Sequence, residues 1–307
     1  MGKTKILIAG LRRSGTTAMW RAFQSDKRIK CFNEPFNPQI MNLSNPNFSG
    51  GEFYREYIDY IREDSVKFWA SYAPISDIYE IRAGLSEQQK DYLNYLAGDS
   101  DHVLFEETRV HHKLADLKNL FPGALLIHLY RPAASFVSSV MLPNPQEQLS
   151  RNWKAIESYR FVRAKLAKMI RKRIFWRSKY CRNMGFDSLI GSSVTDAFSS
   201  FLNRHQIDGD IFYKLPAVAR LLGYWKVSFE EVEKEGRRLF GGRFISLNFN
   251  DFCNDPEGVL KNIYASAGIT YVKRDLDWVH KPHGAYQRSH KKWIEYADII
   301  GLDRALL

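Results

Sequence analysis

The 307-residue sequence is poor in cysteine and has no long apolar run. Its three cysteines, Cys31, Cys181 and Cys253, are scattered, and none belongs to a C-x-x-C pair or a Cys/His cluster. This spacing argues against both a disulfide framework and a structural zinc site. Since no stretch approaches about 18 consecutive apolar residues, we expect no membrane-spanning helix.

Targeting signals, internal repeats and low-complexity tracts are also missing. The first apolar run, Ile6–Ala9, is too short for a signal peptide, so we expect a cytoplasmic protein. Peripheral contact with an anionic membrane stays open because of one long basic stretch, Arg151–Arg182. Its mixture of apolar and basic residues fits an interfacial helix and equally a solvated helix face.

The sequence is rich in positive charge and in aromatic residues. Its net charge is +11, its pI is about 9.4, and Phe, Tyr and Trp make up 14% of the residues. A basic surface attracts anions such as nucleic acid, acidic lipid, acidic polysaccharide or nucleotide. No nucleic-acid-binding module is recognisable, so we expect no nucleic-acid partner.

Short apolar strands alternate with amphipathic helices along the chain. Strands are predicted at Lys5–Gly10, His102–Glu106, Ala124–Leu129 and Arg243–Asn248. Helices are predicted at Thr16–Gln24, Glu52–Asp64, Leu85–Leu96, Leu114–Leu120, Ala133–Met141, Ala217–Phe240 and Pro256–Ala267, with loops at Phe32–Ser49 and His280–Trp293. The alternation predicts an α/β fold with a mainly parallel central sheet flanked by helices. We expect a single domain, 1–307, with a helical insertion or lid at about 143–216.

A glycine-rich loop, Gly10–Thr17, lies between the first strand and the first helix. It nearly matches the nucleotide-binding pattern G-x-x-x-x-G-K-[ST], except that Thr16 stands where the lysine belongs. Backbone N–H groups and the helix dipole make such a turn an anion site. The candidate ligands are Arg12, Arg13, Ser14, Gly15, Thr16 and Thr17.

The missing lysine disfavours ordinary ATP hydrolysis, and no strand clearly ends in a magnesium-binding Asp. We therefore expect no metal. A P-loop kinase or NTPase stays the first alternative, and a basic nucleic-acid-binding protein is a less favoured one.

The run Arg13-Ser14-Gly15-Thr16-Thr17 closely resembles the 5′-phosphosulfate loop of sulfotransferases that use PAPS (3′-phosphoadenosine 5′-phosphosulfate), and is closest in motif to tyrosylprotein and bacterial carbohydrate-type members. The resemblance implies a P-loop-like fold, PAPS as donor, PAP as product, and transfer of a sulfuryl group to an acceptor hydroxyl. It assigns Arg13 to the bridging oxygen and the sulfuryl group, and Thr16 and Thr17 to the 5′-phosphate.

A second motif fits a clamp on the 3′-phosphate of PAPS. Arg131 follows the strand at 124–129, and Ser139 comes eight positions later, as in the sulfotransferase family. An Arg at a strand end and a hydroxyl from the next helix can meet across one phosphate. The neighbouring Ser138 is an alternative ligand.

The candidate general base is Glu34, which comes 21 positions after Arg13. In the tyrosylprotein and several bacterial members a glutamate at a matching offset takes the proton from the acceptor hydroxyl. His111 and His112 are alternatives, because small-molecule members use a histidine in that region. Where many members have Lys-Thr, this chain reads Glu107-Thr108-Arg109, and Arg109 is a candidate substitute for the lysine.

Three further residues resemble nucleotide contacts. Phe249 occupies a position where an aromatic ring stacks on adenine, although a core phenylalanine fits equally well. Lys291 and Lys292 lie in a basic segment that resembles the loop closing over the 3′-phosphate. A carbohydrate hydroxyl, on a glycan or a glycolipid, is the first expectation for the acceptor, while a phenol or a peptide tyrosine stays open.

Overall fold

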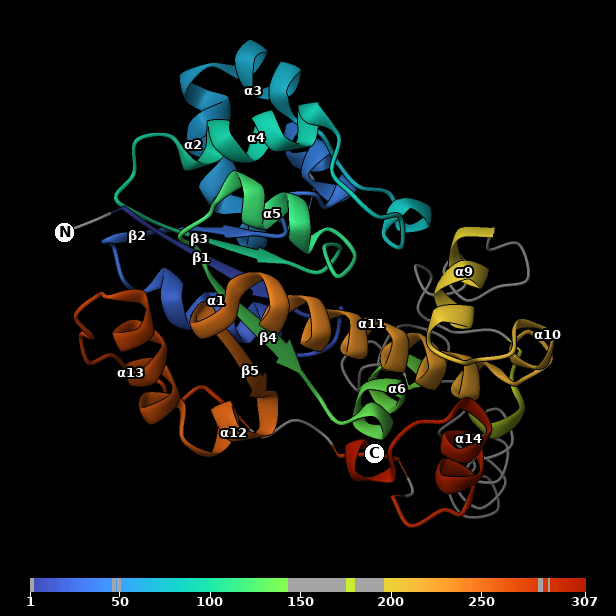
Figure 1. Ribbon diagram of the computed structural model, residues 1–307. Coiled ribbons are helices and arrows are strands. Elements are labelled where there is room, and N and C mark those ends of the chain that lie inside the picture. The colour runs from blue at the N-terminus through green and yellow to red at the C-terminus, as the bar shows by residue number, and fades with distance from the viewer. Residues whose placement is uncertain are drawn as a thin grey trace, which may run out of the picture. The chain divides into compact units, whose positions relative to one another are not determined.

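The computed structural model describes residues 3–45, 48, 51–142, 175–179, 196–280, 284–286 and 288–307. They form an α/β fold around a five-stranded sheet (Figure 1). The strands are β1 (Thr4–Ala9), β2 (Ile29–Asn33), β3 (His102–Glu107), β4 (Leu125–Tyr130) and β5 (Phe244–Asn248). Their order is β2-β3-β1-β4-β5, and every pairing is parallel. The predicted α/β class is therefore confirmed.

Helices cover both faces of the sheet, because apolar side chains alternate across each strand. On β1, Leu7 and Ala9 face one buried cluster, while Ile6 and Ile8 face the other. The first cluster is covered by α2 (Arg55–Glu63), α3 (Ser65–Ser71), α4 (Glu87–Ala97), α5 (Leu114–Leu120) and the end of α11 (Ala217–Phe240). The second is covered by α1 (Thr16–Gln24), α12 (Phe249–Asn254) and α13 (Pro256–Ala267).

The chain divides into two compact units. The first comprises 1–131 and 228–282 and holds the whole sheet; the second comprises 132–227 and 283–307. The second unit contains α6 (Ala133–Met141), α9 (Asp196–Arg204), α10 (Gly209–Phe212), the first part of α11 and α14 (Lys292–Ile300). The insertion expected at about 143–216 lies mostly outside the described residues, so its extent and the single-domain organisation stay predictions.

Aromatic side chains form the core of the second unit. The Trp176 ring lies 4.9 Å from that of Trp293 and 4.5 Å from that of His290, centroid to centroid. Phe175 packs on Tyr286 at 4.7 Å. Aromatic pairs at these separations stabilise a core beyond the area they bury, so this cluster fixes α14 and the segment before it within the unit.

Most predicted helices are confirmed, but two predicted loops are partly wrong. The region 32–49 begins with the end of β2 and contains the 3-10 helix η1 (Pro38–Ser44). The strand was missed because it has only five residues and follows the first helix after a short turn. The region 280–293 likewise contains the start of α14, and α3 and α12 were not predicted.

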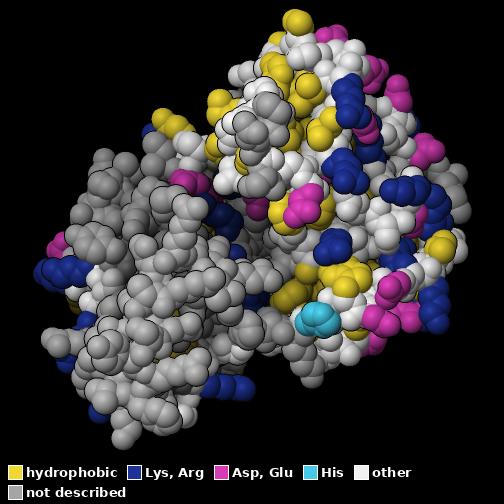
Figure 2. Space-filling model, turned by 180° about the vertical axis from the view of Figure 1, so that it is seen from behind, with side chains coloured by type: hydrophobic (Ala, Val, Ile, Leu, Met, Phe, Trp, Pro, Cys, Tyr) yellow, Lys and Arg dark blue, Asp and Glu magenta, His cyan; other side chains and the backbone are white. Residues whose placement is uncertain are grey.

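Within the described ranges, no helix is both long and apolar enough to cross a membrane. In the view of Figure 2, Lys and Arg side chains lie interspersed with Asp and Glu over the described surface and do not gather into a single basic patch. The basic stretch Arg151–Arg182 lies outside the described residues apart from 175–179. A role for that stretch therefore stays a prediction.

Candidate active site

The loop from Gly10 to Gly15 carries a backbone conformation suited to an anion. Arg13 adopts φ 74° and Gly15 adopts φ 95°, both in the left-handed region. The turn is closed by a 3.0 Å hydrogen bond from the Ser14 N–H to the Leu11 carbonyl. A non-glycine residue such as Arg13 adopts this conformation at an energetic cost, and such strain gathers at ligand-binding turns.

Gly15 is required by both its conformation and its neighbours. A Cβ built on it would lie 2.4 Å from the Phe249 ring, which therefore rests directly against the loop. Gly15 is also the N-cap of α1, and no side chain caps this helix end. Because the first N–H groups of a helix have no acceptor within the helix, they point from here toward any bound anion.

Arg131 is attached to the same loop. Its Nη1 donates a 3.1 Å hydrogen bond to the Arg13 carbonyl oxygen. Burial, together with the positive charge of Arg13, lowers the pKa of Arg131 to about 10. Two guanidinium groups thus lie close enough to repel each other, which a bound anion would relieve.

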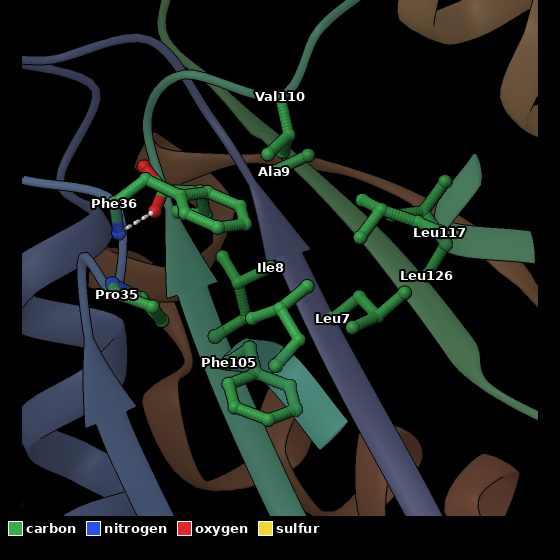
Figure 3. Close-up of a pocket in the computed structure, with 11 residues that line it drawn as sticks. Leu7, Ile8, Ala9, Pro35, Phe36, Phe105, Val110, Leu117 and Leu126 are labelled. Carbon is green, nitrogen blue, oxygen red and sulfur yellow. Dashed lines mark hydrogen bonds between the residues drawn. The ribbon is translucent and has the colours of Figure 1, made fainter. Parts of the chain in front are cut away.

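Glu34 lies in a tight turn directly after β2. Its φ is 46°, again in the left-handed region, and its N–H donates to the Glu106 carbonyl oxygen at 2.7 Å. Two residues later, the Phe36 N–H donates to Oε2 of Glu107 at 2.8 Å, and the Phe36 ring packs over the sheet (Figure 3). The cavity beneath measures only about 10 Å³, so the turn rests on a filled apolar core and has little room to shift.

The Glu34 carboxylate is held on one side. Its Oε2 accepts a 3.1 Å hydrogen bond from Nη1 of Arg109 and another from the Asn37 side-chain amide. The same amide contacts the Tyr54 hydroxyl at 2.7 Å. With 14% of the Glu34 side chain exposed, the group is mostly enclosed but remains open to a substrate.

Glu107 anchors the backbone on both sides of this site, at Phe36 and at Arg109. Glu107 is buried and accepts backbone N–H groups from Phe36, Thr108 and Arg109. Burial raises the pKa of Glu107 to about 7, although Arg109 opposes the rise. Burial tends to lower the pKa of Arg109, but Glu34 and the nearby acidic groups outweigh it, so the net pKa is raised and Arg109 stays charged.

Glu106 lies at the end of β3 and is fully buried. Burial, together with the neighbouring Glu34 carboxylate, holds the pKa of Glu106 well above its ordinary value, and the Thr16 hydroxyl only partly offsets this. The structure thus places two glutamates beside the loop, the fully buried Glu106 and the partly exposed Glu34.

Arg12 takes a different direction from Arg13. Its Nη1 lies 3.0 Å from Oδ1 of Asp77, and its Nη2 lies 2.8 Å from Oε2 of Glu80. Arg13, by contrast, is exposed. A direct contact between Arg12 and a nucleotide stays a prediction, because this guanidinium already binds two carboxylates.

The two candidate histidines follow β3 and are both buried. Burial holds the pKa of His111 well below its ordinary value, and the charge of His112 adds to the effect. Neither ring nitrogen of His111 has a hydrogen-bond partner among the described residues. The described hydrogen bonds to the Glu34 carboxylate come from Arg109 and Asn37 and do not include these histidines.

The other predicted nucleotide ligands lie in the second unit, except Phe249. The Ser138 hydroxyl donates to the Ala134 carbonyl at 2.7 Å and accepts from the Tyr286 N–H at 2.8 Å, so it is already engaged. A phosphate contact by Ser139 stays a prediction. Lys291 is exposed, and Nζ of Lys292 contacts the Tyr296 hydroxyl at 3.0 Å.

Most of the predicted site residues lie in the first unit. The loop residues Arg12–Thr17, Glu34, Arg109, Arg131 and Phe249 all belong to the first unit. Phe249 is only 6% exposed and packs in the core, so stacking on adenine stays a prediction. Sequence reasoning missed Asn37, Tyr54, Asp77, Glu80 and Glu106, and no local pattern marks them.

The described residues contain no group of three or more His, Cys, Asp or Glu side chains arranged to hold a metal ion. The described residues of the site offer helix N–H groups, guanidinium groups and the partly open Glu34 carboxylate. These are donors for a phosphate or sulfate group and an acceptor for a proton.

Comparisons with solved structures return bacterial sulfotransferases. One is STF1 from Mycobacterium tuberculosis H37Rv, with TM-score 0.44 and 16% identity, covering 89% of this chain and 69% of that one. Another is the sulfotransferase domain of the Synechococcus PCC 7002 olefin synthase, with TM-score 0.44 and 15% identity, covering 98% of this chain and 96% of that one. A third, from Alicyclobacillus acidocaldarius, has TM-score 0.40 and 12% identity, covering 99% and 98%.

The comparison with curated proteins finds no match. The model of the sulfotransferase family, in contrast, matches residues 5–191, which is more than half of the chain and includes the loop, Glu34, Arg109, Arg131 and Ser139. On this match, the chain belongs to the sulfotransferase family.

Proposed function

We propose that the protein transfers a sulfuryl group from PAPS to an acceptor hydroxyl on a glycan or glycolipid. One observation carries the proposal: the carboxyl ends of four adjacent parallel strands each supply one part of the site. The phosphate loop follows β1, Glu34 follows β2, Arg109 follows β3 and Arg131 follows β4. Ligands of open α/β sheets bind along this edge.

The residues fit a nucleotide carrying several anionic groups. The N-terminus of α1 and the Thr16 and Thr17 hydroxyls would hold the 5′-phosphate. Arg131 would hold the 3′-phosphate, as the resemblance to the family's clamp motif implies. The mutual repulsion of Arg13 and Arg131 supports this fit, because a bound anion neutralises it.

In the proposed reaction, bound PAPS supplies the sulfuryl group and a PAP leaving group. Glu34 takes the proton from the acceptor hydroxyl, whose oxygen attacks sulfur in line. Arg13 stabilises the charge that develops on the bridging oxygen. Arg109 and Asn37 hold one oxygen of Glu34, which leaves the other to receive the proton.

One feature supports a carbohydrate acceptor. The Tyr79 side chain, 43% exposed, lies under the Arg82 guanidinium at 4.3 Å in the segment whose Asp77 binds Arg12. An exposed aromatic ring beside a cation suits a sugar ring with anionic groups. Peripheral contact with an anionic membrane, through the basic stretch 151–182, would suit a glycolipid and belongs to the same proposal.

Calorimetric titration with PAP, without added magnesium, tests the donor site, with ATP and ADP as controls. We expect micromolar binding of PAP and much weaker binding of ATP and ADP. Preference for ATP with magnesium would instead favour a P-loop kinase or NTPase. Radiolabelled PAPS offered to sulfatable glycans, glycolipids, phenols and tyrosine peptides then identifies the acceptor class.

A further inference from the structure

A chain of alternating charges connects the phosphate loop with Glu34. Arg109 contacts both Glu34 and Asp77: its Nη1 lies 3.1 Å from Oε2 of Glu34, and its Nη2 lies 3.8 Å from Oδ1 of Asp77. Asp77 then binds Arg12 at 3.0 Å, and Arg12 binds Glu80 at 2.8 Å. Since the same Oδ1 atom of Asp77 faces both guanidinium groups, this side chain is the junction of the chain.

The segment that carries Asp77 is held in place independently of it. Nζ of Lys113 donates to three backbone carbonyls, those of Tyr79 at 3.2 Å, Glu80 at 2.9 Å and Arg82 at 2.6 Å. Lys113 is buried and stands just before α5. Changing the Asp77 side chain should therefore leave the backbone of this segment where it is.

Arg12 is poorly suited to bind the nucleotide directly. Its charge is already balanced by two carboxylates, whereas the neighbouring Arg13 is exposed. The loop thus has one guanidinium directed outward and one directed to the interior of the first unit. The inward guanidinium, that of Arg12, connects to Glu34 through Asp77 and Arg109.

We propose that Asp77 is a positioning residue, which orients Arg109 against Oε2 of Glu34 and links that orientation to the phosphate loop through Arg12. The inference rests on the proposed function, because it assigns Glu34 as the base. Asp77 contacts no reacting atom in this scheme. Losing its charge frees Arg109 to turn, so Glu34 loses its fixed direction while the nucleotide contacts of Arg13 and Arg131 remain.

The test is Asp77→Asn, which keeps the size of the side chain and removes its charge. We expect kcat to fall about tenfold, which lies within the range of coupling energies between residues of one charge network, while the Kd for PAP changes less than about twofold. Asp116→Asn is the matched control. Asp116 is also partly enclosed, binds Lys90 at 3.3 Å and accepts the Leu85 N–H at 2.8 Å, but it lies outside the chain of charges. We expect Asp116→Asn to keep the wild-type kcat.

A double-mutant cycle shows whether Asp77 acts through Arg109. In an Arg109→Lys background, Asp77→Asn should lower kcat by less than about twofold, because the group it orients has gone. An equal tenfold loss in both backgrounds, or an unchanged kcat in the single variant, would overturn the inference alone. A wild-type enzyme without PAPS-dependent turnover would instead overturn the proposed function, and the inference with it.

Discussion

Replacing Glu34 by glutamine removes a proton acceptor and preserves the shape of the turn. The amide oxygen of glutamine can still accept the hydrogen bond of Arg109, and both residues meet the same backbone cost at φ 46°. General-base catalysis contributes about 10²–10⁴-fold to a rate. We expect kcat to fall about 10³-fold, equivalent to about 4 kcal/mol in the activation barrier.

The assay follows the transfer of radiolabel from PAPS to the acceptor, and calorimetry measures PAP binding in parallel. Since Glu34 touches the acceptor and not the nucleotide in the proposed reaction, the Kd for PAP should stay within about twofold of wild type. Glu52→Gln, at an exposed glutamate, is the control for loss of a carboxylate in general. If Glu34→Gln keeps more than half of the wild-type kcat, the reasoning is refuted and His111 or His112 becomes the next candidate base.

Three further changes have distinct expected results. Arg131→Ala should weaken PAP binding about 10–100-fold in calorimetry, because a charge-assisted hydrogen bond is worth about 1.5–3 kcal/mol. Gly15→Ala should lower the free energy of unfolding in urea by about 2–4 kcal/mol, because φ 95° and the Phe249 ring both oppose a Cβ. Burial raises the pKa of Glu56 from 4.5 to about 8, so the folded protein keeps a proton there that the unfolded chain releases. The free energy of unfolding should therefore fall between pH 5 and pH 8, and Glu56→Gln should reduce that fall by up to about 4 kcal/mol in urea titrations.

Each of these three predictions would be contradicted by a specific result. Unchanged PAP affinity in Arg131→Ala would remove this residue from the nucleotide site. Wild-type stability in Gly15→Ala would mean that the loop relaxes without cost. Identical pH dependence of wild type and Glu56→Gln would mean that Glu56 ionises inside the folded protein as easily as outside it.

Several helices were predicted at their observed bounds because local signals in the sequence mark them. The bounds of Thr16–Gln24, Leu114–Leu120, Ala133–Met141 and Pro256–Ala267 agree with the structure. In the last of these, Asp255 caps the helix and Gly268 ends it in the left-handed conformation, both of which are visible in the sequence. Such features act over a few residues and need no knowledge of the fold.

The short strand Ile29–Asn33 and the surroundings of Glu34 depend on distant residues. In the described sheet this strand lies at the edge and pairs with β3, whose sequence lies some distance along the chain, so no local pattern distinguishes it from a loop. Asp77 likewise becomes part of the site only when the fold brings its segment to Arg12 and Arg109. The loop motif could be identified from its glycine spacing, but the network behind it could not.

The strand order also bears on how the chain can vary in length. β4 ends at Tyr130 and β5 begins at Phe244, yet the two are hydrogen-bonded neighbours. The whole segment between them is therefore one long connection between two adjacent strands of the sheet. The entropic cost of closing a flexible loop grows only slowly, by about 0.6 kcal/mol for each doubling of its length. Insertions in exposed loops of that segment, unlike changes within its buried helix α6, should therefore be tolerated, so that acceptor preference could diverge while the strands that precede Arg13, Glu34, Arg109 and Arg131 stay the same.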